Sequence, residues 1–581
     1  MKVTLGQINT TPNDFDGNYL QIKYGIKQAI SDGADLIVFP ELSIPGYLIQ
    51  DLIYGHDFVN KNYEYLNKIC DLTKGNKKLY VVVGYVEKNN NGCGKPFYNS
   101  VAVINNGFII GRYNKWLLPF YDVFDESRWF EPGKDLLIFN IDNKRCGVAC
   151  CEDFWNCKGQ DDYNHKMNPI QKYRELGVDV MISLNASPFV EGKPRQRLKM
   201  LEEVCKDSFD LIYVNQYGGQ DQLVFDGHSF VMNKKGIVNG YIVNQLIPDK
   251  KDFTKGAAGA YKTFDTEKFN FIDKNENDEV LKMILLGLYD YGTKSGFKKF
   301  VLGSSGGIDS AVVAALAAMA FGGENVYGIR MPSRWNDAGS KDDAYVLHQN
   351  FGINDRVKPI DYEPWLNSIN KDLGLDDRDF DPETMTRPVG YNAVADENIQ
   401  ARMRGQVVMH YSNAMGALAL GTTNHTEQAV GYGTLFGDLA STINVIGDLY
   451  KMQVFGIAKR INEIYRKEMI PVAIINKPPS AQLAPNQTDE KALMPYAILD
   501  NVCRAYVENY IANLDDFLKS EFGVVVENNE EYIKILNERY DSMIKRIDAM
   551  EFKRRLAAFC IKVTKKAFGP GRRIPICKGR G

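Results

Sequence analysis

The sequence of 581 residues has no run of eighteen or more apolar residues, which excludes an obvious transmembrane helix. It also lacks a strong charge of either sign, because the formal net charge is −3 and Lys and Arg are spread along the chain. This balance argues against nucleic-acid and membrane-surface partners and favours small molecules. No signal peptide precedes the strand-like segment Met1–Ile8, so we expect a cytoplasmic protein.

Cysteine is scarce, and its ten scattered residues favour reduced thiols over a disulfide framework. Four of them, Cys146, Cys150, Cys151 and Cys157, are close in sequence. Their spacing does not give the paired knuckles of a zinc site. Alternation along a strand would also send Cys150 and Cys151 to opposite faces. The sequence therefore predicts no zinc site here.

A chain of this length exceeds what one hydrophobic core usually organises, so we expect two domains. The segment from Asp265 to Glu279 is polar and carries no apolar period, which is typical of a connection between domains. We predict an N-terminal domain over residues 1–265, a linker over 266–279 and a C-terminal domain over 280–581.

In the N-terminal domain, short apolar strands alternate with amphipathic helices, a pattern that predicts an α/β sandwich. The predicted strands are Val3–Ile8, Leu36–Phe39, Leu79–Val86, Val101–Ile104, Leu136–Ile141, Gly147–Ala149, Val180–Leu184 and Leu211–Val214. The predicted helices are Tyr19–Ser31, Pro169–Leu176 and Arg195–Lys206. The segment Asn105-Asn106-Gly107 between two apolar runs predicts a tight hairpin turn.

Three reactive side chains, Glu41, Lys115 and Cys151, each come just after a predicted strand. Loops at the ends of strands can converge although they are far apart in sequence. A carboxylate, an ammonium and a thiol together suit covalent acyl transfer. Glu41 would take the thiol proton, the thiolate of Cys151 would attack an amide carbonyl, and Lys115 would stabilise the oxyanion.

The segments around these residues, Phe39–Ser43, Asn114–Pro119 and Cys151–Trp155, resemble the Glu-Lys-Cys motifs of the nitrilase (carbon–nitrogen hydrolase) superfamily. The resemblance implies an αββα sandwich with the three residues in the roles given above. It also implies that Tyr121, Ser187 and Lys193 contact glutamine, as in the glutaminase-type branch of that superfamily.

The C-terminal domain contains a candidate phosphate loop between the strand-like Phe300–Leu302 and the helix-like Ala311–Ala320. Its residues are Gly303, Ser304, Ser305, Gly306, Gly307, Ile308, Asp309 and Ser310. Freed backbone N–H groups, the helix dipole and the hydroxyls of Ser305 and Ser310 all suit an anion, above all phosphate.

This loop lacks the Gly-Lys-Ser/Thr ending of P-loop kinases and GTPases, and Asp309 stands near its end instead. A carboxylate beside phosphates makes sense if it holds Mg²⁺, since the two anions would otherwise repel each other. Ser305–Ser310 resembles the SGGxDS loop of the ATP-pyrophosphatase (PP-loop) superfamily. That resemblance implies ATP binding, pyrophosphate release and a Rossmann-like α/β domain. The strand–helix–strand pattern that ends at Val326–Pro332 predicts a parallel sheet.

Two further groups of residues follow the loop. Asn398 and Arg402 are one helical turn apart, a spacing that lets both approach one nucleotide. Glu427 comes shortly after the apolar strand Ala417–Leu420, so it is expected at the same sheet edge as Asp309. Two carboxylates would then flank one Mg²⁺ on the phosphates.

Motifs throughout this domain resemble those of NAD⁺ synthetases. They are Asn398–Arg404, Thr422–Glu427, Gly431–Asp438, Asp448–Lys451, Pro479–Glu490 and Glu551–Arg555. With the nitrilase-type domain before them, their order resembles the glutamine-dependent NAD⁺ synthetase family over nearly the whole chain.

That resemblance implies ATP binding by residues 303–310 and Thr422, and metal binding by Asp309 and Glu427. It implies that Asn398, Glu427 and Lys553 contact deamido-NAD⁺, and that synthetase domains pair in a homo-oligomer. Shorter, ammonia-using relatives have Lys and Asp at the positions of Leu435 and Thr442, so contacts there do not carry over.

The resulting hypothesis is an enzyme with two sites. Glutamine hydrolysis at Cys151 supplies ammonia, and Mg-ATP at the loop adenylates deamido-NAD⁺ for amidation to NAD⁺. Because ammonium predominates near neutral pH, a dry internal tunnel would keep ammonia nucleophilic. Two alternatives stay open, namely an amidating synthetase for another carboxylate and a nucleotide-sensing protein with inactive sites.

Overall fold

The computed structural model describes residues 1–155, 165–236, 238–241, 260–263, 276–333, 338–372, 394–480, 483, 489–526 and 529–577. The chain divides into two compact units, Met1–Glu276 and Asn277–Gly581. Within the described ranges, no helix is long and apolar enough to cross a membrane. The predicted linker, 266–279, falls largely outside the described residues, and helix α5 (Glu276–Lys294) begins inside it. The predicted domain boundaries therefore stay a prediction.

The first unit is built on two six-stranded sheets, with the orders β14-β1-β2-β3-β4-β5 and β13-β12-β9-β8-β7-β6. The strands of the first sheet are β1 (Val3–Gln7), β2 (Leu36–Val38), β3 (Tyr80–Lys88), β4 (Phe97–Asn105), β5 (Phe108–Asn114) and β14 (Ala260–Thr263). Those of the second are β6 (Ile138–Ile141), β7 (Lys144–Cys150), β8 (Val180–Asn185), β9 (Asp210–Asn215), β12 (Phe230–Met232) and β13 (Val238–Tyr241). A separate hairpin pairs β10 (Tyr217–Gln220) with β11 (Leu223–Asp226).

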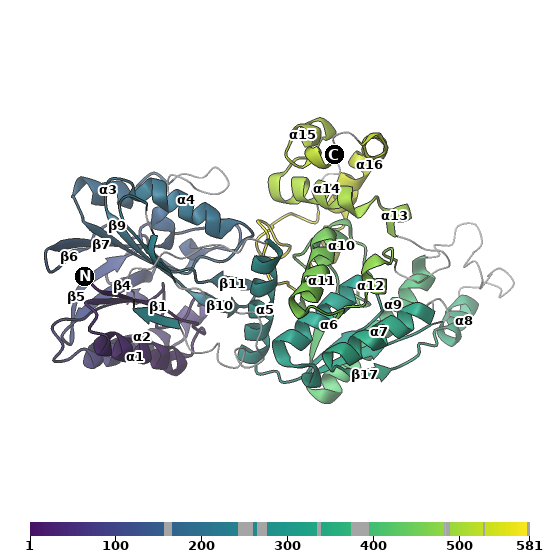
Figure 1. The fold of residues 1–581 in the computed structure, drawn as a ribbon, viewed down its shortest axis with the longest axis horizontal. Helices are drawn as coiled ribbons and strands as arrows, with labels where there is room; N and C mark the ends of the chain where they lie inside the picture. The colour runs from purple at the N-terminus through teal and green to yellow at the C-terminus, as the bar shows by residue number, and fades with distance from the viewer. Residues whose placement is uncertain are drawn as a thin grey trace. The chain divides into compact units, whose positions relative to one another are not determined.

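Helices cover the outer face of each sheet (Figure 1). Helices α1 (Phe15–Ser31) and α2 (Phe58–Leu72) pack on the first sheet, and α3 (Pro169–Glu175) and α4 (Lys193–Cys205) pack on the second. Between the sheets, apolar side chains such as Val82 and Val148 form a third core layer. The predicted αββα sandwich is confirmed.

The second unit is centred on a parallel sheet of five strands, in the order β17-β16-β15-β18-β19. The strands are β15 (Phe300–Gly303), β16 (Val326–Arg330), β17 (Asn354–Val357), β18 (Leu418–Gly421) and β19 (Ile443–Asn444). The helices around it include α6 (Ile308–Phe321), α7 (Ala338–Phe351), α8 (Glu363–Asp372), α9 (Val394–Met415), α10 (His425–Val430), α11 (Lys451–Tyr465) and α12 (Val472–Asn476). The predicted parallel sheet is confirmed, and its carboxyl edge is where ligands bind in such folds.

The C-terminal helices form a lobe with its own apolar core, which includes Phe517, Leu536 and Tyr540. They are α13 (Asp489–Ala492), α14 (Tyr496–Asn509), α15 (Leu514–Lys519), α16 (Glu530–Ala549) and α17 (Glu551–Arg554). The charges of α16 lie opposite this core, as expected for an amphipathic helix at the surface.

Local sequence accounts for most of these elements. Asn106 and Gly107 both have positive φ, which the predicted turn between β4 and β5 requires. Helix α1 begins at Phe15, four residues before the predicted start, because the Asp14 side chain caps it by accepting from the Gly17 N–H. Helix α2 was not predicted.

Candidate active sites

The structure brings Glu41, Lys115 and Cys151 of the first unit together. They follow β2, β5 and β7, respectively, and none is more than 7% exposed. Lys115 Nζ donates to Glu41 Oε1 at 2.7 Å, and both side chains are fully buried. The predicted juxtaposition of an acid, an amine and a thiol is therefore present, and their catalytic roles remain to be tested.

The Glu41 carboxylate is held by donors from two other segments. Asn99 Nδ2 donates to Oε1 at 2.7 Å, and the Ala186 N–H donates to Oε2 at 3.1 Å. Strand β3 passes so close behind that a Cβ on Gly84 would lie 2.2 Å from the Leu42 nitrogen. Because no side chain fits there, Gly84 sets the position of the Pro40–Leu42 backbone that carries Glu41.

A second buried acid, Glu126, also contacts the lysine. It lies on the short turn η2 (Glu126–Arg128), and Lys115 Nζ donates to its two oxygens at 3.0 and 2.9 Å. The Tyr47 hydroxyl donates to the same carboxylate at 3.0 Å. Burial raises the pKa of Glu126 to about 7, although Lys115 opposes the rise. Sequence reasoning missed this residue.

Cys151 opens the turn η3 (Cys151–Phe154) with a φ of 44°. Left-handed backbone is unusual for cysteine, and such conformations cluster at functional positions. Burial, together with the charge of Glu41, raises the pKa of the Cys151 thiol well above its ordinary value, while Lys115 acts in the opposite direction. The resting thiol is therefore protonated, and a base must take its proton before it can act as a nucleophile.

The three residues that the resemblance assigned to glutamine are held by contacts with three different segments of the first unit. The Tyr121 hydroxyl donates to Glu152 Oε2 at 2.8 Å. The Ser187 N–H donates to Asn215 Oδ1 at 2.9 Å, and Lys193 Nζ donates to the Pro188 carbonyl at 3.0 Å. Their role as a set stays a prediction.

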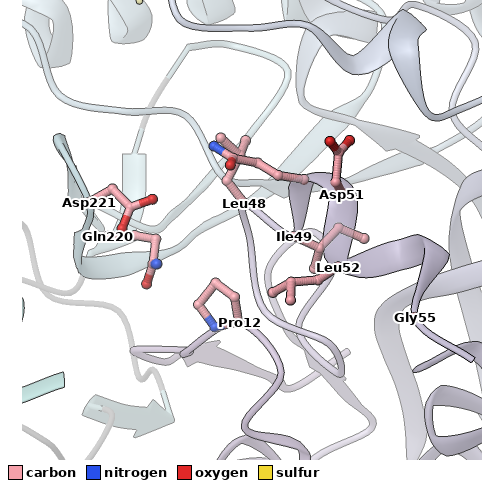
Figure 2. A pocket seen from close by; sticks show the side chains of 9 residues that line it. Pro12, Leu48, Ile49, Asp51, Leu52, Gly55, Gln220 and Asp221 are labelled. Atoms are coloured by element: carbon pink, nitrogen blue, oxygen red, sulfur yellow. The ribbon is translucent and has the colours of Figure 1, made fainter. Parts of the chain in front are cut away.

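The first unit also has a separate open cavity of about 630 Å³, shown in Figure 2. Its lining residues are Pro12, Leu48, Ile49, Gln50, Asp51, Leu52, Gly55, Gln220 and Asp221, and none belongs to the predicted site. Asp51 Oδ1 accepts from Trp129 Nε1 at 2.6 Å, which ties this wall to the segment just after Glu126. The cavity therefore neighbours the acid–lysine cluster without containing it.

In the second unit, a cavity of about 750 Å³ lies at the carboxyl edge of the parallel sheet. All the residues to which the resemblance assigned ATP, metal or deamido-NAD⁺ binding line it. These are Gly303, Ser304, Ser305, Gly306, Gly307, Ile308, Asp309, Ser310, Asn398, Thr422, Glu427 and Lys553. The expected convergence of distant motifs on one cavity is thus observed.

The loop itself is ordered by its own serines. Ser310 Oγ accepts from the Ser305 N–H at 3.2 Å and donates to the Gly307 carbonyl at 3.1 Å. Gly306 has a φ of 79°, which only glycine adopts readily. The loop therefore turns sharply into α6 and presents backbone N–H groups at the helix N-terminus, where an anion is favoured.

Lys451, at the start of α11, lies between the two predicted metal ligands. Its Nζ is 2.5 Å from Asp309 Oδ2 and 3.1 Å from Glu427 Oε1. Burial alone would lower the pKa of Lys451, but the two carboxylates raise it above its ordinary value. Burial raises the pKa of Glu427 to about 8 against the opposing effect of Lys451. Sequence reasoning gave this lysine no role, although it stands in the motif Asp448–Lys451.

The donor set fits Mg²⁺. Asp309 and Glu427 come from α6 and α10 and converge on one cation, the ammonium of Lys451. Their other carboxylate oxygens accept from the Asn424 side chain and backbone at 2.9 and 3.2 Å, which fixes their direction. Hard carboxylate oxygens beside a phosphate loop are the ligands that Mg²⁺ takes together with substrate phosphates.

The remaining predicted residues frame the segment Gly431–Asp438. Lys553 Nζ donates to the Gly431 and Gly433 carbonyls at 2.8 and 2.7 Å, and Asn398 Oδ1 accepts from the Thr434 hydroxyl at 2.6 Å. Arg402 does not line the cavity. Its Nε donates to the Leu435 carbonyl at 3.3 Å, so it holds this segment from outside, and the expectation that it approaches the nucleotide is not supported.

Comparisons with known proteins agree with both halves. Residues 2–241 match the family model of carbon-nitrogen hydrolase, and residues 280–557 match that of NAD synthase. The glutamine-dependent NAD(+) synthetase of Thermotoga maritima is 34% identical over 611 residues, covering 99% of this chain and 98% of that protein. The chain belongs to the glutamine-dependent NAD(+) synthetase family.

Two more members of this family bear out the assignment. The enzyme of Acinetobacter baylyi is 35% identical over 588 residues and covers 100% of this chain and 98% of its own. The solved structure of glutamine-dependent NAD+ synthetase from Acinetobacter baumannii in complex with adenosine diphosphate is 30% identical. It has a TM-score of 0.71 and covers 99% of this chain and 98% of that one. The family expected from the motifs is confirmed.

Proposed function

We propose that this protein converts deamido-NAD⁺ to NAD⁺ in an ATP-dependent amidation, with ammonia taken from glutamine. The convergence of Asp309 and Glu427 beside the phosphate loop, in a chain that also holds the Glu41–Lys115–Cys151 cluster, carries this proposal. The names of its relatives, which are glutamine-dependent NAD(+) synthetases, support the choice of substrates.

At the first site, Glu41 takes the proton of Cys151 Sγ, and the thiolate attacks the γ-amide carbon of glutamine. The Lys115 ammonium stabilises the oxyanion that develops on the carbonyl oxygen. Glu41 returns the proton to the leaving nitrogen, the carbon–nitrogen bond breaks and ammonia departs. Water then hydrolyses the γ-glutamyl thioester and releases glutamate. Tyr121, Ser187 and Lys193 are proposed to hold the substrate.

At the second site, a carboxylate oxygen of deamido-NAD⁺ attacks the α-phosphorus of ATP, and pyrophosphate leaves. Ammonia attacks the carbonyl carbon of the resulting adenylate, the bond to AMP breaks, and NAD⁺ is formed. Residues 303–310 would line the ATP site, and the N-terminus of α6 and the ammonium of Lys451 would bind the phosphates. Asn398, Glu427 and Lys553 are proposed to contact deamido-NAD⁺, and Thr422 to contact ATP.

Asp309 and Glu427 are the residues that would hold Mg²⁺ with the phosphates. When bound, the ion neutralises phosphate charge and helps pyrophosphate to leave. Without it, both carboxylates would repel the triphosphate, and Lys451 alone would offset only one of the two charges.

The Cys151→Ala variant tests the first site. Glutamine-supported NAD⁺ synthesis should vanish, while synthesis from added ammonium chloride should stay within about twofold of the wild type. Cys150→Ala is the matched control, because Cys150 is the neighbouring buried thiol and packs in the core between the sheets. Loss of both activities in a folded Cys151→Ala protein would contradict the two-site scheme.

The Asp309→Ala variant tests the second site. It should abolish pyrophosphate release from ATP and leave glutamine hydrolysis intact, because the acid lies only in the second unit. Unchanged NAD⁺ formation would rule out the proposed metal role. Pyrophosphate release assayed against a panel of carboxylic acids separates deamido-NAD⁺ from another acceptor.

We also propose that the protein is a homo-oligomer that pairs its synthetase domains. Sedimentation of the full chain at several concentrations tests this, and a single species with the mass of one chain, 65.7 kDa, would contradict it.

A further inference from the structure

In the second unit, a chain of hydrogen bonds runs from the phosphate-loop cavity to helix α7 and the neighbouring strands β16 and β17. Ser304 Oγ is 3.0 Å from His348 Nε2, and His348 Nδ1 is 2.6 Å from Asp355 Oδ1. Arg330 closes the chain through a bidentate pair, with Nε 2.8 Å and Nη2 2.7 Å from the Asp355 carboxylate. The four residues come from the end of β15, α7, β17 and β16. Of them, only Ser304 has been assigned a role above.

The charge of Asp355 sets the direction of each hydrogen bond. Burial alone would raise the pKa of Asp355, but hydrogen bonds from Arg330 and His348 lower it below its usual range. Burial lowers the pKa of His348 below its ordinary value despite the neighbouring carboxylate. An ionised carboxylate only accepts, so Nδ1 of the neutral imidazole carries the hydrogen. Nε2 is then an acceptor, and the Ser304 hydroxyl must donate to it.

This arrangement leaves Ser304 without a hydrogen to offer the cavity. Its oxygen faces the ligand with lone pairs only, whereas a phosphate oxygen requires a donor. We infer that Ser304 accepts a hydrogen bond from the nucleoside part of ATP, a ribose hydroxyl or the adenine amino group, and that His348 is the positioning residue that imposes this polarity. The inference rests on the proposed use of ATP and adds a specificity element to it.

Close packing against strand β16 fixes the position of the His348 ring. His348 is 0% exposed, and its ring lies directly over strand β16. A Cβ on Gly328 would come within 2.3 Å of His348 Nε2, so only glycine leaves room for the ring at this distance.

The cavity that Ser304 lines also has apolar walls, which come from α7, from β17 and from just after β16, the elements that carry the other three residues of the hydrogen-bond chain. Met331, Ala344 and Val357 line the same cavity, and such apolar side chains suit the faces of a base or a sugar better than a charged group. The hydroxyls of Ser305 and Ser310 and the loop N–H groups lie at the helix N-terminus, where phosphate is favoured. Ser304 Oγ is therefore placed to accept a hydrogen bond from the nucleoside part of ATP.

Equilibrium binding to the full chain, with Mg²⁺ present, tests the inference. ATP is compared with three analogues that each lack one candidate donor. 2′-Deoxy-ATP lacks the 2′-hydroxyl, 3′-deoxy-ATP lacks the 3′-hydroxyl, and purine riboside triphosphate lacks the adenine amino group. One of the three should bind the wild type about fivefold to tenfold more weakly than ATP, the size of one neutral hydrogen bond. Ser304→Ala should lose that discrimination and bind ATP as weakly as it binds that analogue. Its kcat should stay within about twofold while its KM for ATP rises.

His348→Gln should lose the same discrimination, because an amide side chain can turn either its oxygen or its NH₂ group toward Ser304. His410→Gln is the matched control, since His410 is exposed on α9 and has no place in the site. Circular dichroism checks the fold of each variant, and Ser304→Ala keeps the test decisive if His348→Gln does not fold.

Three results would overturn the inference. The first is equal binding of all four nucleotides to the wild type, and the second is Ser304→Ala that still discriminates. The third is covalent labelling of Ser304 by diisopropyl fluorophosphate, which would make it a nucleophile activated by His348. Absence of any ATP binding to the wild type would instead refute the proposed function, so the two failures are distinguishable.

Discussion

Replacing Glu126 by glutamine separates the effect of this acid on the rate of glutamine hydrolysis from its effect on the free energy of unfolding. Glu41, Lys115 and Glu126 form a buried cluster of two carboxylates and one ammonium. When all three are ionised the cluster carries one net negative charge, whereas Glu126→Gln leaves a neutral pair of Glu41 and Lys115. The variant keeps an acceptor oxygen for Lys115 and nearly the same volume, so the packing changes little.

The expected gain in stability follows from the pKa of Glu126, which is about 7 in the folded protein against an ordinary value of 4.5. The folded state therefore binds this proton more tightly than the unfolded chain does. The stability that Glu126 contributes is fully present below pH 4.5 and is lost as the pH rises through 7. A shift of about 2.5 units corresponds to about 3 kcal/mol. Glutamine does not ionise and avoids this loss.

Urea unfolding of the wild type and Glu126→Gln at pH 5 and pH 8 measures the effect. The two proteins should have similar unfolding free energies at pH 5, and the variant should be more stable by about 3 kcal/mol at pH 8. Glu64→Gln, which removes an exposed acid of α2, should change stability by less than about 0.5 kcal/mol at either pH. Destabilisation of Glu126→Gln at pH 8 would refute the reasoning.

The Glu126→Gln variant should lose glutaminase activity although it gains stability. With one of its two partners neutral, Lys115 is held less firmly, and a displacement near 1 Å costs about 100-fold in rate. Glutamine hydrolysis by Glu126→Gln should fall by about this factor, while ammonia-supported synthesis stays unchanged. The wild-type rate should also fall below pH 7 as Glu126 takes up its proton. A variant with full glutaminase activity would show that Glu126 does not position the lysine.

Other substitutions probe single contacts. Lys451→Met should lower pyrophosphate release by at least about 1,000-fold without affecting glutamine hydrolysis, because two carboxylates then face the triphosphate unopposed; retained release would exclude a phosphate-binding role. Gly84→Ala should abolish glutamine hydrolysis but spare ammonia-supported synthesis, since its Cβ would lie 2.2 Å from the Leu42 nitrogen and displace Glu41; unchanged KM and kcat for glutamine would contradict this. Asp226→Asn should destabilise the protein by about 3 kcal/mol at pH 7, because it leaves the buried Arg197 without its carboxylate partner. The lowered pKa of Asp226 means that this deficit is fully present above the ordinary carboxyl pKa of 3.8 and shrinks only as the pH falls below it, which thermal unfolding at pH 7 and at about pH 2.5 would reveal.

The residues that sequence reasoning placed correctly share one property. Glu41, Lys115 and Cys151 each follow a strand, and Asp309 lies in the first turn of α6, just after the loop that follows β15. Strand ends in these folds meet at one edge, so position along the chain was enough to predict convergence. The continuous apolar runs of β3 and β8, which are buried on both faces, likewise allowed the bounds of these two strands to be predicted within two residues.

Glu126, Lys451 and His348 carry no such local signal. Glu126 stands between Asp125 and Arg128 in a stretch that is typical of a solvated turn, and only tertiary packing buries it. Lys451 reaches Asp309 across 142 residues of sequence, and His348 reaches Ser304 across 44. Contacts between residues so far apart in sequence depend on how the helices pack on the sheet, and the spacing of residues along the chain does not specify that packing.

The transfer of nitrogen from glutamine to the nicotinate carboxylate is the central claim. Wild-type protein with [amide-¹⁵N]glutamine, deamido-NAD⁺, ATP and Mg²⁺ tests it by mass spectrometry of the products. The account predicts NAD⁺ with ¹⁵N in its carboxamide, and one AMP, one pyrophosphate and one glutamate for each NAD⁺ formed. Glutamate without labelled NAD⁺, or ADP and phosphate in place of AMP and pyrophosphate, would contradict it.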